Sequence, residues 1–434
     1  MEKCILLGNG AREAVIAEKI SEGFELYCIM PYENPTISEF SQKSNGKILI
    51  GDPFDKELVK KFIKEEDITN CVISSDNLLR DGLIDLAREL GLKTFGPTSL
   101  GSKIEWSKTY ALDIVQKIAP EMVIKNFEVR SKEELRKIID ENYKDDNFVI
   151  KPEGLTGGKG VKVGGIHFKG KEEGYTYALS CLEDSGVVIV QDKVEGREFT
   201  VTGLTDGKNL VITPTTFDYP YRFDEDKGPG TGGMGCLSFE TGILPFLNQE
   251  DINKCADLMK NVIKYINRDG NEFTGPIYGG FFKCENGIKF IEFNARFGDP
   301  EALNILNTLE TPFKEVFDNI QKQNLSEENC KFAKKAVCTV YMVSPNYAIS
   351  SSKEPCKYTL NKEEINKMGA KVYFASSKRL QGNSYESVGN SRLVAIVAED
   401  ENLEKAKHKV YTAIEGNVDS VLNFRKDIGT IYIH

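Results

Sequence analysis

About two thirds of the way along the chain stands a strand-like sequence, Ile291-Glu292-Phe293-Asn294-Ala295-Arg296-Phe297-Gly298-Asp299-Pro300-Glu301. On a β-strand, the side chains of Glu292 and Asn294 point to one face, and those of Ile291 and Phe293 point to the other. Two hard oxygen donors on one face suit Mg²⁺, which retains water and accepts nucleotide phosphates as further ligands. Arg296, one step further along that face, could hold a carboxylate with its bidentate fork. A polar outer face is ordinary for an edge strand, but the Arg-Phe-Gly-Asp-Pro-Glu ending is not.

A glycine-rich loop closes an earlier strand, Phe148-Val-Ile-Lys151-Pro-Glu-Gly-Leu-Thr-Gly-Gly-Lys159-Gly-Val161. Glycines allow backbone NH groups to approach phosphate oxygens, and the ammonium groups of Lys151 and Lys159 would balance the phosphate charge. The stretch is not a Walker A loop, because no helix-starting Gly-Lys-Ser/Thr follows it. It predicts a polyphosphate site, and a mobile hairpin with incidental lysines is the alternative.

Two further segments would complete a nucleotide site. Five of the eight residues 228–235 are glycine, so this loop either moves or wraps closely around a ligand. Residues 191–198 have strand, turn and strand character, and their backbone could bind adenine while Glu198 turns toward the ribose hydroxyls. Taken alone, this second segment cannot be distinguished from a charged hairpin.

Near the N-terminus, a tight turn separates the first strand from the first helix, with the sequence Gly8-Asn9-Gly10-Ala11-Arg12-Glu13. A helix N-terminus that follows such a turn binds anionic groups. A dinucleotide-binding fingerprint would need glycine in place of Glu13, which favours a phosphate-bearing substrate over NAD. An NAD(P)-dependent oxidoreductase would also leave the other four segments unexplained.

The composition excludes several classes of protein. A chain of 434 residues fits two to four domains, and 40% hydrophobic with 28% charged residues is typical of a globular protein. No apolar run is long enough to span a bilayer, and the N-terminus leads directly into a strand, so we expect a cytoplasmic protein without a signal peptide. The net charge of −10 argues against nucleic-acid or anionic-membrane partners. Ten scattered cysteines without a CxxC pair predict packed thiols, and three histidines outside any motif make a zinc site or a His-based triad improbable.

The order of strands and helices predicts three regions. Residues 3–95 alternate strands (4–7, 26–30, 71–74 and 93–95) with helices (12–21, 55–66 and 80–90), which implies a parallel sheet with crossover helices. Residues 99–325 mix glycine-rich loops with strands expected at 148–151, 187–191, 198–204 and 209–215. A polar linker at 324–329 precedes a small α+β region with strands at 336–343, 371–374 and 393–397 and a helix at 403–413.

In this order and spacing, the segments resemble the phosphoribosylamine–glycine ligase family of the ATP-grasp superfamily. The resemblance runs nearly end to end, from Gly8-Asn-Gly10 to Phe424-Arg-Lys-Asp-Ile-Gly429, and includes Phe95-Gly-Pro-Thr98, Ser107-Lys108, Thr231-Gly-Gly-Met-Gly235 and the 292–301 stretch. It implies an α/β and α+β protein with a Rossmann-like N-terminal domain (1–104), a two-part ATP-grasp domain (105–326) and a small C-terminal domain (327–434). The reaction would join glycine to 5-phosphoribosylamine through a glycyl phosphate, giving glycinamide ribonucleotide, ADP and phosphate in purine biosynthesis.

The resemblance also implies a role for each matched residue. Lys108 and Lys151 would contact ATP phosphates, and the lid would include Gly157, Gly158, Lys159 and Gly160. Gln191 and Val194 would meet adenine, Glu198 the ribose, and Glu292 with Asn294 would hold Mg²⁺ or Mn²⁺. Arg296 would hold the glycine carboxylate, with Lys151 and Lys159 as further catalytic residues. The acceptor would contact Gly8, Gly10, Arg12, Asp76, Asp218, Arg222, Asp299 and Arg392. Small-molecule substrates and a monomer or weak homodimer complete the expectation.

The sequence departs from the family pattern where the phosphoribosyl amine is expected to bind. The family usually shows Gly-Gly-Arg-Glu-His, Gly-Pro-Glu-Ala-Pro, Asp-His-Lys-Arg, Gly-Gly-Tyr-Pro and Gly-Gly-Arg. This chain instead reads Gly10-Ala-Arg-Glu-Ala14, Ser74-Ser-Asp-Asn-Leu78, Asp218-Tyr-Pro-Tyr-Arg222, Ser344-Pro-Asn-Tyr347 and Gly389-Asn-Ser-Arg392. Loop drift within one function is one interpretation, and a related ligase that couples glycine or another small amino acid to a different amine is the other. Retention of Glu292 and Asn294 argues against a non-catalytic nucleotide-binding protein.

Overall fold

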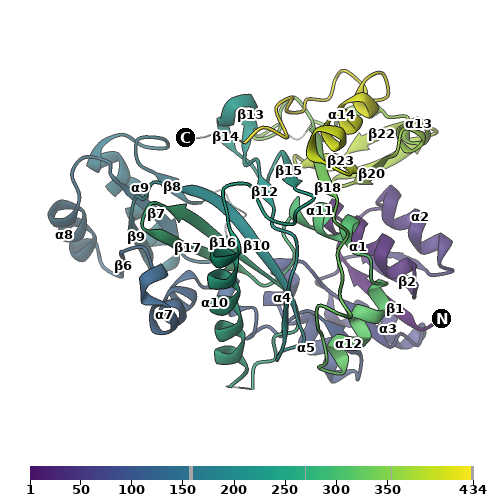
Figure 1. The fold of residues 1–434 in the computed structure, drawn as a ribbon, viewed down its shortest axis with the longest axis horizontal. Coiled ribbons are helices and arrows are strands. Elements are labelled where there is room, and N and C mark those ends of the chain that lie inside the picture. The colour runs from purple at the N-terminus through teal and green to yellow at the C-terminus, as the bar shows by residue number, and fades with distance from the viewer. Residues whose placement is uncertain (156–159, 269, 353, 432–434) are drawn as a thin grey trace.

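A five-stranded parallel sheet, ordered β3-β2-β1-β4-β5, forms the N-terminal region of the computed structural model, which describes residues 1–155, 160–268, 270–352 and 354–431 (Figure 1). The strands are β1 (Lys3–Leu7), β2 (Glu25–Met30), β3 (Ile48–Ile50), β4 (Asn70–Val72) and β5 (Lys93–Phe95), and the helices are α1 (Ala11–Ser21), α2 (Pro35–Lys43), α3 (Lys56–Glu65), α4 (Asp76–Arg80) and α5 (Leu83–Glu89). Along β1, Cys4 and Leu6 join one hydrophobic cluster while Ile5 and Leu7 join another, so both faces of the sheet are covered.

The predicted helix at 80–90 is wrong as a single element. Gly82 has a left-handed backbone (φ 77°) and separates α4 from α5. A helix interior cannot accommodate that conformation, and glycine adopts it without steric penalty. Strand β3 and helix α2 were not predicted from the sequence, although Asn34 caps α2 by accepting from the NH groups of Thr36 and Ile37.

Two antiparallel sheets make up the central region. The first, ordered β6-β9-β7-β8, contains β6 (Asn126–Val129), β9 (Val188–Asp192), β7 (Phe148–Pro152) and β8 (Lys162–Val163), and α8 (Lys132–Asn142) and α9 (Gly170–Ser185) pack against it. The second, ordered β11-β10-β16-β17, contains β11 (Leu210–Ile212), β10 (Arg197–Thr205), β16 (Gly275–Cys284) and β17 (Gly287–Asn294). Helices α7 (Lys108–Ile118) and α10 (Gln249–Asn267) share a hydrophobic core with this second sheet.

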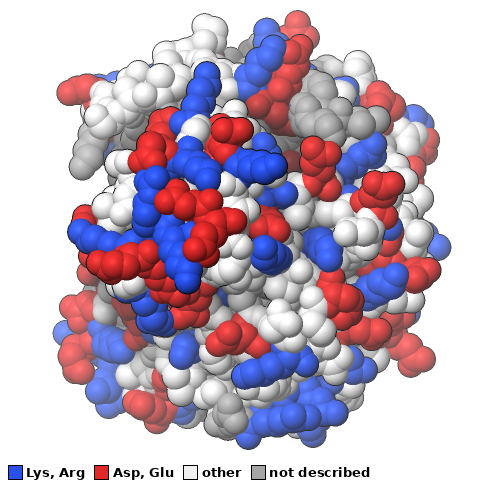
Figure 2. Space-filling model, turned by 90° about the vertical axis from the view of Figure 1, so that its left-hand side faces the viewer, with Lys and Arg blue, Asp and Glu red and all other residues white. Residues whose placement is uncertain are grey.

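The first sheet and its helices occupy the left side of Figure 1. On the face seen from that side, basic and acidic side chains are interspersed (Figure 2). Two of the ion pairs join α8 to α9, with Lys132 2.7 Å from Glu183 and Arg136 2.7 Å from Glu172. Exposed pairs of this kind each contribute little stability, so the shared hydrophobic cluster is what holds the two helices together.

A third large sheet, ordered β12-β15-β18-β23-β20, combines distant parts of the chain. It contains β12 (Phe217–Asp218), β15 (Gly235–Ser238), β18 (Ala336–Val343), β23 (Arg392–Asp400) and β20 (Ala370–Phe374), with α14 (Leu403–Ile414) packed on it. A smaller sheet, β19-β22-β21, joins β19 (Lys357–Thr359), β22 (Ser384–Ser387) and β21 (Ser377–Gln381), and α13 (Lys362–Lys367) lies nearby. Two strands that precede residue 240 thus belong to the sheet of the C-terminal region, and the domain limits at 104 and 326 stay predictions.

The remaining helices are α6 (Lys103–Trp106), α11 (Glu301–Thr308) and α12 (Phe313–Gln321). The predicted linker at 324–329 packs against the central region, because Leu325 is buried and its NH donates to Asp206 at 2.8 Å. All ten cysteines are free thiols and nine are buried, as the sequence predicted. Among the described residues, no helix is both long enough and apolar enough to cross a membrane.

Candidate active site

One face of the second central sheet carries both predicted oxygen donors. On β17, Glu292 lies opposite Gly280 of β16, which in turn lies opposite Thr200 of β10. Gly280 has no side chain between Glu292 and Thr200, and a Cβ at this position would lie 3.6 Å from Glu292 Cγ. Asn294 follows on the same strand, and Glu292 and Asn294 are both half-buried. Two half-buried oxygen-donor side chains on one strand fit a hydrated divalent cation.

Two lysines from other elements approach Glu292. Lys151, at the end of β7, is buried and its Nζ donates to the carbonyl of Ile291 at 3.3 Å, which bridges the two central sheets. Burial lowers the pKa of Lys151 to about 8, although the charge of Glu292 opposes that shift. Burial likewise lowers the pKa of Lys108, which begins α7 and is also close to Glu292. The charge of Lys108 also lowers the pKa of Lys151, and two desolvated ammonium groups are suited to a polyphosphate.

Glu153 is a residue that the sequence interpretation missed. Its carboxylate accepts from Ser107 Oγ at 2.7 Å, Lys108 N at 3.1 Å and Thr109 Oγ1 at 3.1 Å, so it caps the N-terminus of α7. Lys108 Nζ in turn donates to the carbonyl of Gly154 at 2.6 Å. The start of α7 is thereby fixed to the strand that carries Lys151. Nothing in the local sequence identifies this cap, because the partners are more than 40 residues apart.

The predicted lid is described only in part. Gly157, Gly158 and Lys159 lie outside the described residues. Gly160 is described, and its carbonyl accepts from Tyr177 OH of α9 at 2.6 Å.

Three residues predicted to contact the nucleoside border the same region. Gln191 on β9 is 2% exposed, and its Nε2 has no hydrogen-bond partner among the described residues. An unpaired buried amide costs about 1–3 kcal/mol, which a ligand acceptor would recover. Val194 lies in the turn after β9. Glu198 is the second residue of β10, where desolvation and then the charge of Glu292 raise its pKa, and the charge of Lys151 opposes that shift.

Arg296 is held on three sides. Its Nη1 donates to the carbonyl of Phe297 at 3.0 Å, its Nη2 donates to Asn294 Oδ1 at 3.2 Å, and its Nε forms an ion pair with Glu105 at 3.0 Å. The ion pair is close but not aligned as a hydrogen bond. The side chain remains 17% exposed, so an incoming carboxylate can reach it.

Glu105, on α6, was also missed in the sequence. It is buried, and its other oxygen accepts from the NH of Ala295 at 2.8 Å. Burial raises the pKa of Glu105, and the charge of Arg296 opposes that shift. Glu105 therefore fixes both the backbone and the guanidinium at the end of β17.

The N-terminal glycine turn meets this arginine. Gly8 has φ +122°, and the NH of Gly10 donates to Glu13 Oε2 at 2.8 Å, so Glu13 rather than solvent covers the start of α1. Arg12 Nε pairs with Glu13 at 2.8 Å, and its Nη1 donates to the Phe297 carbonyl at 3.3 Å. Arg12 and Arg296 thus donate to one carbonyl oxygen and bring two positive charges together. Asp76, the first residue of α4, raises the pKa of Arg296 and therefore lies in the same cluster.

Arg392 connects the C-terminal region to the site. Its Nη2 lies 3.0 Å from Asp299 Oδ2, and its Nη1 donates to the carbonyls of Asp299 at 2.9 Å and Gly233 at 3.1 Å. A Cβ on Gly10 would stand 3.8 Å from the same Asp299 oxygen, which places the N-terminal turn beside Arg392's partner. Burial and the charge of Glu301 raise the pKa of Asp218, and Arg392 opposes that shift.

Arg222 differs from the other predicted acceptor residues. It is 2% exposed, and its guanidinium donates to the carbonyls of Tyr347 at 3.1 Å and Ser344 at 3.3 Å. That arrangement favours a structural role over a contact with a substrate. The other predicted residues that the structure describes form two adjoining groups: one around Glu292, the predicted nucleotide end, and one around Arg296, the predicted acceptor end.

Known proteins are similar to this chain in sequence and in fold. The model of the phosphoribosylglycinamide synthetase N domain matches residues 2–105, and the model of its ATP-grasp (A) domain matches residues 106–302. A phosphoribosylamine–glycine ligase of Methanocaldococcus jannaschii is 35% identical over 436 residues, which cover 98% of this chain and 96% of that protein. This chain belongs to the phosphoribosylamine–glycine ligase family. The resemblance inferred from the motifs is thereby confirmed, as is the mixed α/β and α+β fold.

Other members and relatives of the family agree. A phosphoribosylamine–glycine ligase of Thermococcus gammatolerans is 32% identical over 431 residues, covering 99% of this chain and 94% of that protein. The crystal structure of a phosphoribosylamine–glycine ligase from Thermotoga maritima superposes with a TM-score of 0.78 at 24% identity, covering 98% of this chain and 100% of that one. A Campylobacter jejuni biotin carboxylase complex shares the fold, with a TM-score of 0.73 at 15% identity over 99% of this chain and 94% of that one.

Proposed function

We propose that the two adjoining ends of the site divide the family's reaction between them. The reaction is that of a phosphoribosylamine–glycine ligase in purine biosynthesis: ATP, glycine and 5-phosphoribosylamine give ADP, phosphate and glycinamide ribonucleotide. The observation that carries the assignment is the order of residues along β17. Glu292 and Asn294 lie on the strand, and Arg296 follows just after its end and donates to Asn294. A nucleotide phosphate and a small carboxylate bound along this strand would lie next to each other.

The nucleotide end is assigned to residues from both central sheets. Glu292 and Asn294 would hold Mg²⁺, with Mn²⁺ as a substitute, and the ion would supply charge neutralisation on the transferred phosphoryl group. Lys108 and Lys151 would bind phosphate oxygens. Two observations support this fit: the two desolvated lysines close to Glu292, and the buried amide of Gln191, which has no hydrogen-bond partner among the described residues. Gln191 and Val194 would then contact adenine, and Glu198 the ribose.

The glycine end is assigned to Arg296. Its guanidinium would hold the carboxylate of glycine so that one carboxylate oxygen attacks the γ-phosphorus in line. The bond to the β–γ bridging oxygen breaks, and ADP leaves. The amine of the acceptor then attacks the carbonyl carbon of glycyl phosphate, the C–N bond forms and phosphate leaves. No side chain has to act as a nucleophile, so positioning and charge are the contributions of the protein.

The acceptor end is assigned to the cluster that surrounds Arg12. Phosphoribosylamine carries a dianionic phosphate and ribose hydroxyls, which suit a guanidinium and a carboxylate respectively. Arg12 and Asp76 supply these groups next to Arg296. Gly8, Gly10, Asp218, Asp299 and Arg392 complete the proposed contacts. We further propose that the protein acts in the cytoplasm as a monomer or weak homodimer.

A related ligase with a different amine acceptor is the second candidate. Two of the segments that depart from the family pattern contact each other, because Arg222 donates to the carbonyls of Ser344 and Tyr347. Changes in two segments that contact each other would accompany a change of the amine acceptor.

The experiment that separates the candidates measures ADP release from ATP and glycine, with and without phosphoribosylamine generated in the assay. Stimulation by phosphoribosylamine together with formation of glycinamide ribonucleotide supports the first candidate. Turnover of glycine with simple amines but not with phosphoribosylamine would establish the second.

A further inference from the structure

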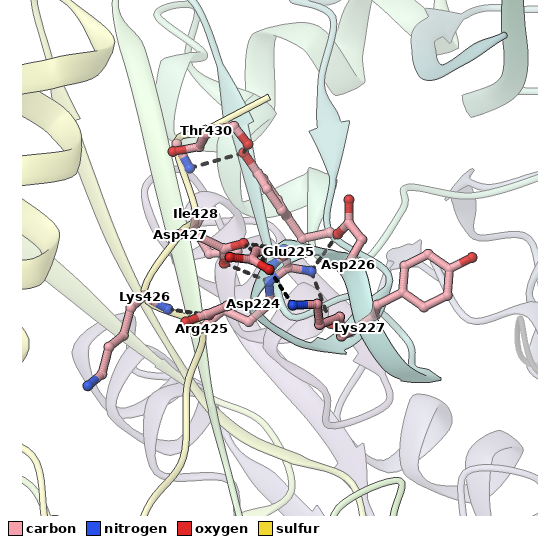
Figure 3. Close-up of polar contacts among 12 residues, drawn as sticks. Asp224, Glu225, Asp226, Lys227, Arg425, Lys426, Asp427, Ile428 and Thr430 are labelled. Atoms are coloured by element: carbon pink, nitrogen blue, oxygen red, sulfur yellow. Dashed lines mark hydrogen bonds and ion pairs between the residues drawn. The ribbon is translucent and has the colours of Figure 1, made fainter. Parts of the chain in front are cut away.

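A segment near the C-terminus is held by hydrogen bonds and ion pairs to a hairpin that supplies none of the proposed nucleotide contacts. We name residues 424–430 the C-terminal segment, and the hairpin consists of β13 (Tyr221–Phe223) and β14 (Lys227–Gly230) with the turn 224–226. Figure 3 shows Arg425 at the centre of this contact, surrounded by acidic side chains from both partners. The contacts proposed above for ATP, glycine and phosphoribosylamine involve none of these residues.

All three nitrogens of the Arg425 guanidinium donate hydrogen bonds. Its Nε and Nη2 bind the two oxygens of Asp427 at 2.8 and 2.6 Å, and its Nη1 binds Asp226 at 2.7 Å and the carbonyl of Tyr221 at 3.2 Å. The side chain is fully buried, with its guanidinium carbon 4.9 Å from the centre of the Tyr219 ring. A buried arginine that donates to groups on two segments fixes their separation, because moving either segment away would leave guanidinium NH donors buried without acceptors.

The turn that Arg425 holds is strained. Glu225 and Asp226 are consecutive non-glycine residues with left-handed backbones, at φ 59° and 53°. Such a conformation costs roughly 1–2 kcal/mol per residue, so it persists only where surrounding contacts impose it. Those contacts come from the C-terminal segment: Asp427 accepts from the NH of Glu225 at 2.8 Å, and Asp224 accepts from the NH of Lys426 at 2.9 Å (Figure 3).

A second set of contacts fixes the strand that precedes the hairpin. Tyr219 OH donates to the carbonyl of Thr430 at 2.8 Å and accepts from the NH of Gly429 at 3.0 Å. Tyr219 directly follows Asp218, whose carboxylate accepts from the NH of Tyr219 at 2.7 Å. The C-terminal segment therefore sets the position of Asp218 as well as that of the turn.

The hairpin transmits this position to the acceptor end of the site. Tyr221 pairs with Gly230, and both the NH and the hydroxyl of Thr231 donate to the carbonyl of Pro220, at 2.7 and 2.8 Å. The carbonyl of Gly233, two residues after Thr231, accepts a hydrogen bond from Arg392, which also binds Asp299. A path of hydrogen bonds and short backbone segments thus connects Arg425 to the carboxylate beside the N-terminal glycine turn.

We infer that Arg425 is a positioning residue for the amine acceptor. By fixing the turn 224–226, it places Asp218 and the Gly232–Gly233 backbone where glycyl phosphate must meet the amine. The nucleotide and glycine ends should depend on it less, since their residues lie on α7, β7, β9, β10 and β17 and in the segments that follow β9 and β17. This inference rests on the proposed assignment of the acceptor end. It goes beyond that assignment by giving the C-terminal segment a part in the second half of the reaction.

The test compares Arg425→Lys with Arg379→Lys, a matched substitution in the same region of the chain. Arg379 also lies over a tyrosine ring, 5.7 Å from the centre of Tyr385, but it contacts none of the segments above. Lysine keeps the charge of Arg425 and loses the fork that joins Asp427 to Asp226. Steady-state assays should give KM for phosphoribosylamine, KM for ATP, and the ratio of ADP released to glycinamide ribonucleotide formed.

For Arg425→Lys we expect KM for phosphoribosylamine to rise about tenfold, KM for ATP to change less than about twofold, and the ADP ratio to exceed that of wild type. The ratio rises because glycyl phosphate is hydrolysed when the amine is misplaced. A purely structural role would lower the amount of active enzyme and leave both KM values and the ratio unchanged, which would overturn the inference. Arg379→Lys should match wild type.

If Arg425→Lys does not fold, Asp226→Asn is the second variant, because it keeps the size of the side chain in the turn and weakens the ion pair with Arg425. The same rise in KM and in the ADP ratio is expected from it, and unchanged values would likewise refute the inference. Failure of the proposed function gives a different result, since wild-type enzyme would then form no glycinamide ribonucleotide at all.

Discussion

The charge state of Lys151 should make nucleotide binding depend on proton uptake. Burial lowers the pKa of this lysine from 10.5 to about 8. One pKa unit corresponds to 1.36 kcal/mol, so keeping Lys151 charged destabilises the folded protein without ligand by about 3 kcal/mol. Because the folded-state pKa is the lower one, this loss is complete below about pH 8 and disappears as the pH rises toward the unfolded-state value. A bound triphosphate reverses the balance by pairing with the ammonium group.

Binding of a non-hydrolysable ATP analogue at pH 9 should therefore be accompanied by uptake of about 0.9 proton by Lys151, which is about nine tenths neutral in the free protein at that pH. At pH 7 the uptake by this group should be about 0.1 proton. Isothermal titration calorimetry in two buffers of different ionisation enthalpy measures the uptake directly. Between pH 8.5 and 9.5, the dissociation constant should also rise about tenfold.

Lys151→Arg is the matched control, since arginine keeps its charge throughout this range. The difference in proton uptake between wild type and Lys151→Arg isolates the lysine from the titration of the nucleotide itself. Equal uptake by the two proteins at pH 9 would refute the reasoning, because it would mean either that Lys151 is charged in the free protein or that it does not meet the phosphates.

Three further predictions concern the proposed contacts. Glu292→Gln should nearly abolish ADP formation at ordinary Mg²⁺ and leave the melting temperature within a few degrees of wild type, because the half-buried side chain loses a charge but little packing; full activity would remove the metal assignment. Arg296→Lys should raise KM for glycine by about tenfold or more while KM for ATP stays constant, since a lysine lacks the bidentate fork. An unchanged glycine KM would show that the carboxylate binds elsewhere. Arg12→Ala should raise KM for phosphoribosylamine more than about tenfold, in line with a lost charged contact of roughly 1.5–3 kcal/mol, and equal KM values would contradict the acceptor assignment.

The strands and their chemistry were predictable where the signal is local. The sequence of the 291–294 stretch identifies β17, although a bulge at Ile291 interrupts the expected alternation of faces, and the run at 336–343 gives β18 with its observed limits. Gly82 shows where a local pattern fails, because the helical periodicity continues across a residue whose left-handed backbone interrupts the helix.

The partners of the predicted residues could not be found in this way. Glu105 contacts the NH of a residue 190 positions away, and Glu153 caps a helix that begins 45 positions earlier. Neither carboxylate is set apart by its own neighbours in the sequence, so only the folded chain identifies them. The same reasoning applies to Glu13, which was noted as a departure from a glycine fingerprint and proved to cover the helix start itself.

The shared sheet of the C-terminal region has a consequence for how the protein is made. Among the described residues, strand β15 (Gly235–Ser238) pairs with the short β12 and with β18 (Ala336–Val343), and β18 leaves the ribosome roughly a hundred residues later. At typical translation rates of 5–20 residues per second, the edge of β15 stays unpaired for about 5–20 s. An open strand edge is a template for pairing with another chain. Nascent chains that stall before residue 343 should therefore aggregate or recruit chaperones, whereas chains stalled after residue 400 should not.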